Sequence, residues 1–136
     1  MRAVLLVMIV GCGSGPYDHG DYCGSDADCG GQVCGRDEFC HDASELRGVR
    51  VMWTVNGGEA NATSCAPNPD FYLEFDTGDS YNYFGYAPVP CMQGSFFIDK
   101  IPNYYNSVLI SLDNGRTYDQ QQPIDSSGTA SFNLAF

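Results

Sequence analysis

Basic residues are scarce in this chain of 136 residues. Lysine occurs once, at Lys100, and six lysines and arginines stand against 17 aspartates and glutamates, which gives a formal net charge of −11 at pH 7. Recognition of nucleic-acid phosphates requires clustered lysine and arginine, and an anionic membrane surface repels a chain of this charge. We therefore expect no nucleic-acid partner. The surplus of acids is expected to form a solvated surface that keeps a secreted protein soluble.

Helical periodicity is also lacking. After residue 12, no segment repeats apolar residues at helical spacing over three turns. The chain instead contains 16 glycines, nine tyrosines and eight phenylalanines, and asparagine, aspartate and serine recur at short intervals. This composition favours short β-strands joined by turns.

An apolar run near the start of the chain predicts export. Residues 3–10 are all apolar. The run is too short to cross a bilayer as a helix, which takes about 20 residues, but it fits the apolar part of a secretory signal peptide. The stretch that ends the run, Ile9-Val10-Gly11-Cys12, resembles the lipobox of bacterial lipoproteins.

That resemblance implies a lipoprotein signal peptide over residues 1–11 and acyl chains such as palmitate on Cys12, which hold a protein to a membrane. The alternative is an ordinary signal peptide that leaves Cys12 as a spare thiol. Residues 12–22, which include a Gly-Ser-Gly stretch, are expected to form a flexible tether. We expect the protein in the cell envelope, as an outer membrane lipoprotein or at the cell surface, with the membrane as a partner through the anchor.

Six further cysteines form an even set, as an oxidising compartment favours. The simplest partition places two disulfides within residues 23–42 and one between Cys65 and Cys91. Four cysteines allow three pairings. We favour the interleaved pairs that are common in small disulfide modules, although spacing alone leaves the other pairings open: Cys23–Cys34 and Cys29–Cys40. Residues 23–42 are nearly devoid of apolar side chains, so cross-links must hold them.

Metal binding is the alternative use of this segment. Four thiols with His19 and His41 could hold zinc, but the close C-x2-C knuckles of zinc ribbons are missing. Asp26, Asp28 and Asp37 fall at positions 1, 3 and 12 of an EF-hand-like loop and are the calcium candidates. The loop lacks flanking helices and a ligand at position 5. We therefore expect no cofactor and no metal.

The sequence CGSDADCGGQVCGRDEFC, residues 23–40, resembles the small cysteine-rich segments that follow the anchor in myxobacterial-type surface lipoproteins. The resemblance covers about 18 residues and implies the same location for this chain.

Residues 46–136 alternate apolar and polar side chains with period two, the pattern of half-buried strands. Strands are expected over residues 49–55, 71–76, 81–87, 94–99, 108–112 and 129–136, with turns at 56–58, 77–80 and 113–115. About seven short strands predict an all-β fold: an antiparallel β-sandwich, Ig-like or transthyretin-like, behind the disulfide-rich segment. Trp53, the only tryptophan, is expected to anchor its core.

Two stretches of this domain resemble known sandwiches. GSFFI and IPNYY, residues 94–98 and 101–105, resemble the G-x-F-x-F … L-P-x-G-x-Y signature of transthyretin-like, carboxypeptidase-regulatory-type domains, with Asn103 where that family has glycine. VMWTVNGG, followed by a later cysteine, is similar to the sandwich of myxobacterial-type lipoproteins. These resemblances imply a fold and a location, and they carry over no catalytic residue.

The sequence predicts a binding protein in preference to an enzyme. Glu74 and Asp76 share one face of a single strand, which by itself does not specify a glycosidase, and only His19 and His41 could serve as a general base at neutral pH. The candidate ligand-binding residues are aromatic side chains that crowd one strand: Tyr81, Tyr83, Phe84 and Tyr86. They either fill the sandwich or bind a glycan or protein in the envelope. We expect a lipid-anchored, non-catalytic binding or presentation module. The alternatives are a structural accessory domain of an envelope complex and, further off, a hydrolase.

Overall fold

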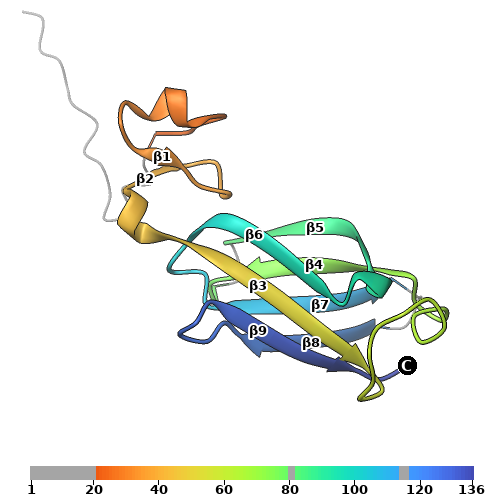
Figure 1. Ribbon diagram of the computed structural model, residues 1–136. Coiled ribbons are helices and arrows are strands. Elements are labelled where there is room, and N and C mark those ends of the chain that lie inside the picture. Colours follow the sequence, from red (N-terminus) through yellow and green to blue (C-terminus); the bar gives the residue numbers. More distant parts are fainter. Residues whose placement is uncertain (1–20, 80–81, 114–116) are drawn as a thin grey trace, which may run out of the picture.

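We describe the protein from a computed structural model, which places residues 21–79, 82–113 and 117–136 (Figure 1). These residues form a small cysteine-rich unit, residues 21–42, and a β-sandwich that begins at Leu46. The predicted all-β sandwich behind a disulfide-rich segment is confirmed. No helix in the described residues combines the length and apolar character needed to cross a membrane.

The sandwich has two layers, built in the described ranges from seven strands. One sheet has the order β6-β3-β9 and the other the order β5-β4-β7-β8. Their bounds are β3 (Leu46–Val55), β4 (Asp70–Asp76), β5 (Tyr83–Pro90), β6 (Ser95–Pro102), β7 (Ser107–Asp113), β8 (Thr117–Pro123) and β9 (Thr129–Leu134). Neighbouring strands are antiparallel except β3 and β9, which run parallel. The expected antiparallel arrangement therefore needs this one correction.

The period-two pattern explains the core. On β3 the residues Val49, Val51 and Val55 are at most 2% exposed, whereas Arg50, Met52 and Thr54 face solvent. β4, β7 and β9 alternate in the same way, so both inner faces bury a row of aliphatic and aromatic side chains. Trp53 is buried among them, and its indole N–H donates to the carbonyl of Cys91 at 2.7 Å. The prediction that Trp53 anchors the core is confirmed.

Two strands differ from the sequence prediction. β5 continues through Pro88 and Pro90, beyond the expected end at residue 87, because β5 is an edge strand and an edge strand tolerates residues without an N–H. β8 was not predicted, since its sequence TYDQQQP is polar. Its Gln120 nonetheless closes the sandwich by donating to the carbonyl of Asn133 on β9 at 3.3 Å. The predicted turn at 113–115 falls largely outside the described residues.

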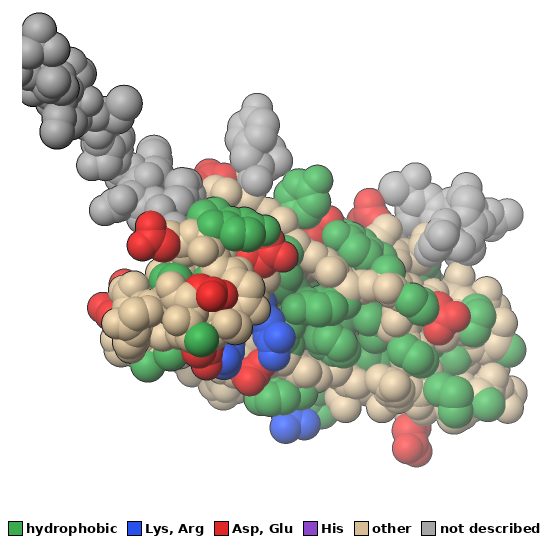
Figure 2. All heavy atoms as spheres, turned by 90° about the horizontal axis from the view of Figure 1, so that it is seen from above, with side chains coloured by type: hydrophobic (Ala, Val, Ile, Leu, Met, Phe, Trp, Pro, Cys, Tyr) green, Lys and Arg blue, Asp and Glu red, His purple; other side chains and the backbone are tan. Residues whose placement is uncertain are grey.

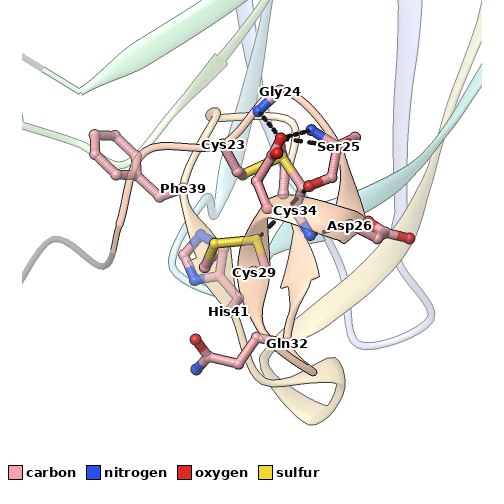
Figure 3. The surroundings of a disulfide bond; sticks show 12 residues. Cys23, Gly24, Ser25, Asp26, Cys29, Gln32, Cys34, Phe39 and His41 are labelled. Carbon is pink, nitrogen blue, oxygen red and sulfur yellow. Dashed lines mark hydrogen bonds between the residues drawn. A yellow bond between two sulfur atoms is a disulfide. The ribbon is translucent and has the colours of Figure 1, made fainter.

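Three disulfides are present among the described residues, and they are the three favoured pairs: Cys23–Cys34, Cys29–Cys40 and Cys65–Cys91. Figure 3 shows the first two inside the cysteine-rich unit, whose other elements are one 3₁₀ turn and two short strands. These are η1 (Asp26–Cys29), β1 (Val33–Cys34) and β2 (Cys40–His41). The third disulfide joins the loop after β3 to the 3₁₀ turn η3 (Cys91–Gln93).

The cysteine-rich unit is connected to the sandwich through the 3₁₀ turn η2 (Ala43–Glu45) and docks on β6. The register of β6 with β3 slips between Ile98 and Ile101, so that Asp99 and Lys100 form a bulge opposite Gly48. The N–H of Arg36 donates to the carbonyl of Lys100 at 3.0 Å, and the Arg36 guanidinium pairs with Asp99. The bulge therefore gives the unit both a backbone and an ionic contact.

Candidate functional site

The outer face of the four-stranded sheet is the candidate functional surface; we call it the outer sheet face. On β4, Tyr72, Glu74 and Asp76 alternate with the buried Phe71, Leu73 and Phe75 and so point away from the core. The strand pairing then sets their neighbours on the edge strand β5. Glu74 lies opposite Gly85, and Asp76 lies opposite Tyr83.

Two tyrosine rings share this face. Tyr83 is 58% exposed. Tyr72 lies across Gly85: a Cβ atom at that glycine would come within 2.1 Å of the Tyr72 hydroxyl oxygen. The missing side chain of Gly85 thus lets the Tyr72 ring cover the sheet, an arrangement known to support glycines near sheet edges. Partial burial, and then the nearby Glu74 carboxylate, raise the pKa of Tyr72.

Hydrogen-bonding groups surround the two rings. Partial burial raises the pKa of Glu74, and the negative charges of Asp76 and Asp119 act in the same direction. The Gln121 amide donates to Ser107 Oγ at 2.9 Å and lies 3.5 Å from a carboxylate oxygen of Asp76. The outer sheet face therefore combines apolar rings with acceptors and an amide. Such a surface can bind a ligand that has both C–H faces and hydroxyl groups.

The structure divides the three described residues of the predicted aromatic set between two faces. Tyr83 points outward, whereas Phe84 and Tyr86 are half-buried and pack against the core. Phe84 stacks on Phe75 with ring centroids 5.2 Å apart. Tyr81 lies outside the described residues. The sequence did not predict that the Tyr72 ring lies over Gly85. The only available signal was that Tyr72 alternates with buried residues.

The three predicted calcium candidates do not converge. Asp26 accepts hydrogen bonds from Lys100 and from the N–H of Cys34. Asp28 instead accepts from the backbone N–H groups of Gly24 and Ser25 at 3.0 and 2.9 Å, closing the turn shown in Figure 3. These hydrogen bonds lower the pKa of both carboxyl groups. Each aspartate thus serves its own local structure.

The third candidate, Asp37, forms a cluster with His41 and Tyr104. Both Asp37 carboxylate oxygens lie 3.0 Å from His41 Nε2, and the Tyr104 hydroxyl donates to one of them. The Asp37 side chain is only 5% exposed. Partial burial and the Asp37 contact raise the pKa of Tyr104. In the described part of the chain no serine, threonine or cysteine hydrogen-bonds to His41, so the cluster joins the two units without forming a nucleophile–base pair.

The cysteines are likewise engaged. Cys23, Cys29 and Cys40 have sulfur atoms close enough to share a metal ion, and they are the one such group within the described ranges. All three are in disulfides, so the thiolates that zinc needs are not available there. His19, the other predicted zinc candidate, lies outside the described residues.

Comparison of the chain with protein-family models, curated proteins and solved structures found no match. Function must therefore be argued from the surface itself.

Proposed function

We propose that this chain is a lipid-anchored protein of the bacterial envelope that binds a neutral glycan on its outer sheet face, without catalysis. The lipobox-like Ile9-Val10-Gly11-Cys12 and the resemblance of residues 23–40 to myxobacterial-type surface lipoproteins support the anchor and the location. The disulfides suit an oxidising compartment.

The observation that carries the binding proposal is the exposed Tyr83 ring beside a second ring, Tyr72, that lies across Gly85. Aromatic rings offer flat, electron-rich faces to the C–H groups of a sugar. On the same face, carboxylates can accept hydrogen bonds from the sugar hydroxyls, and an amide can donate hydrogen bonds to them. The net charge of −11 repels acidic polysaccharides. A neutral glycan is the ligand that meets all three conditions.

The same geometry favours binding over hydrolysis. A glycosidase places two carboxyl groups on opposite sides of the scissile bond. Glu74 and Asp76 instead project from the same face of one strand, two residues apart. A sugar chain lying over them would meet both carboxylates from the same side, which suits hydrogen bonding.

Binding is tested by sedimenting the oxidised protein with insoluble cellulose, β-1,3-glucan and mannan, with alginate as the acidic comparison. Tyr83→Ala should weaken binding to the preferred neutral glycan about tenfold, the loss expected for one well-placed ring. Phe97→Ala is the matched control, because Phe97 is 59% exposed but lies on the other sheet. Equal losses in both variants, or none in Tyr83→Ala, would contradict the proposal. A protein that binds no polysaccharide would favour the structural accessory role.

The anchor is tested by the intact mass of protein recovered from the membrane fraction, before and after reduction. The proposal predicts loss of residues 1–11, added acyl mass on Cys12, and six hydrogens gained on reduction of the three disulfides. An unacylated soluble product would remove the anchor from the proposal and leave the glycan test unaffected.

A further inference from the structure

A cleft of about 640 Å³ lies where the cysteine-rich unit meets the sandwich. Asp26, Arg36 and Glu38 line it from the cysteine-rich unit, and Tyr86 and Lys100 line it from the sandwich. Its volume falls in the range of small-ligand sites, which are about 300–1,000 Å³. The cleft does not lie on the outer sheet face. Tyr86 pairs with the buried Leu73, so its side chain points to the inner side of the sheet.

The cleft concentrates charge of both signs. The described residues contain four lysines and arginines, and two of these, Arg36 and Lys100, line its walls. Figure 2 shows basic side chains gathered at this junction, next to hydrophobic side chains of the sandwich. Lys100 Nζ lies 2.8 Å from both carboxylate oxygens of Asp26, and Arg36 pairs with Asp99. Half of the basic residues in the described part of the chain therefore lie at this one cleft.

These ion pairs can exchange partners. Asp26 and Asp99 are each 53% exposed, and ion pairs at that exposure contribute little free energy. The hydrogen bonds from Lys100 and Arg36 lower the pKa of both carboxyl groups, so both stay ionised at neutral pH. A ligand that carries a carboxylate and an ammonium group could take part in these pairs. Its carboxylate would replace an aspartate as the partner of a cation, and its ammonium group would replace a cation as the partner of an aspartate.

Tyr86 supplies the apolar wall and a free polar group. Its ring packs against Phe96 with centroids 5.3 Å apart. Within the described residues, no group hydrogen-bonds to its hydroxyl. The hydroxyl is therefore available to a ligand, while the ring already has a fixed position.

We propose that this cleft binds a short peptide with free amino and carboxyl ends. The carboxylate lies between Arg36 and Lys100, where the guanidinium fork can bind it through two hydrogen bonds. The ammonium group lies against Asp26 and Glu38, and an apolar side chain lies on the Tyr86 ring. A simple anion is a poorer ligand, because it would displace acidic partners and leave their charges unpaired.

The test uses the oxidised, ¹⁵N-labelled protein and the tripeptide Ala-Phe-Ala with both ends free. Saturable NMR shifts should map to residues 24–27, 34–38, 86 and 100. The C-amidated and the N-acetylated peptides should each bind about tenfold more weakly, because each loses one charge-assisted hydrogen-bonded end. Lys100→Gln should weaken binding of the free peptide about tenfold and reduce its advantage over the amidated peptide.

Three variants keep the result interpretable. Arg50→Gln removes a cation that lies over the exposed Phe97 ring on the outer face of the three-stranded sheet, outside the cleft. It should leave binding unchanged. Tyr86→Phe keeps the ring packing and removes only the hydroxyl that is open to the peptide, so it should weaken binding about threefold without unfolding the unit. Blocked peptides that bind as well as the free one, or no saturable shift up to about 10 mM, would overturn the proposal. Tyr83→Ala should bind the peptide normally, so the outcome is independent of the glycan test.

Discussion

Removal of the Cys65–Cys91 disulfide tests how the sandwich is stabilised. The bond spans 26 residues and links the loop after β3 to the turn before β6. Both cysteines are buried, and Cys91 also accepts the indole hydrogen bond of Trp53. The double variant Cys65→Ala/Cys91→Ala removes the cross-link and keeps that backbone carbonyl in place.

The expected decrease in the free energy of unfolding can be calculated from the loop length. Chain-entropy arguments give about 3.5 kcal/mol at 25 °C for a loop of this size. The space left by two buried sulfur atoms adds about 1 kcal/mol. The sum of about 4.5 kcal/mol is a large part of the stability of a small domain, which is typically about 5–15 kcal/mol. At a urea dependence of about 1.5–2 kcal/mol per molar, the midpoint should fall by roughly 2–3 M.

Urea unfolding monitored by the fluorescence of Trp53, the single tryptophan, gives this number directly. The matched control is Cys23→Ala/Cys34→Ala, which opens a disulfide in the cysteine-rich unit. It should shift the Trp53 transition by less than about 1 kcal/mol, because that bond restrains a different unit. A loss below about 1 kcal/mol in the Cys65/Cys91 variant would refute the reasoning, since the unfolded loop would then already be restricted without the bond.

Three further predictions follow from the described contacts. Hydrogen bonds from cations lower the pKa of Asp26 and Asp99 below the unfolded value of 3.8, so their contribution to docking is complete above about pH 4 and is lost as the pH falls further. Hydrogen-exchange protection factors at the junction should therefore drop by pH 3, by no more than several-fold because exposed ion pairs contribute little free energy, while those of the sheet ladders persist. Partial burial raises the pKa of Glu74, so the wild type loses stability as the pH rises from about 4.5 through the folded pKa. The urea midpoint of Glu74→Gln should therefore exceed that of the wild type by more at pH 7 than at pH 4. An equal excess at both pH values would contradict the burial argument. Trp53→Phe leaves the buried Cys91 carbonyl without its donor, which should cost about 2–3 kcal/mol in urea unfolding followed by circular dichroism. A loss under about 0.5 kcal/mol would mean that another group satisfies that carbonyl.

The sequence predicted the parts of the fold that rest on local alternation. β3 and β4 follow from their period-two rows, because one buried face fixes which side chains point inward. Cysteine parity and spacing, with the preference for interleaved pairs, were enough to favour the three disulfides that are present. Trp53 could be assigned to the core because it stands in phase with three valines.

Other features depend on contacts between distant residues. β8 has a polar sequence, and its place in the sheet depends on pairing with β7. Nothing in the pattern of β9 says that its partner is β3 or that the pair is parallel. The cleft arises because a bulge in β6 brings Lys100 to Asp26, 74 residues earlier in the chain. Ion pairs between exposed residues leave no periodic signal, so the cleft could not be predicted from the sequence.

The parallel pairing of β3 with β9 has a consequence for the order of events during folding. Val51 pairs with Phe96 on β6 and with Ala130 on β9, so the central strand of this sheet lacks its second neighbour until nearly eighty more residues have been made. Pairings across such sequence distances form slowly, since the entropy of the intervening chain is lost before the contact is gained. During synthesis, β3 therefore keeps one strand edge open next to its valine row. That interval is when this chain is most exposed to aggregation, and truncation before residue 129 would make it permanent.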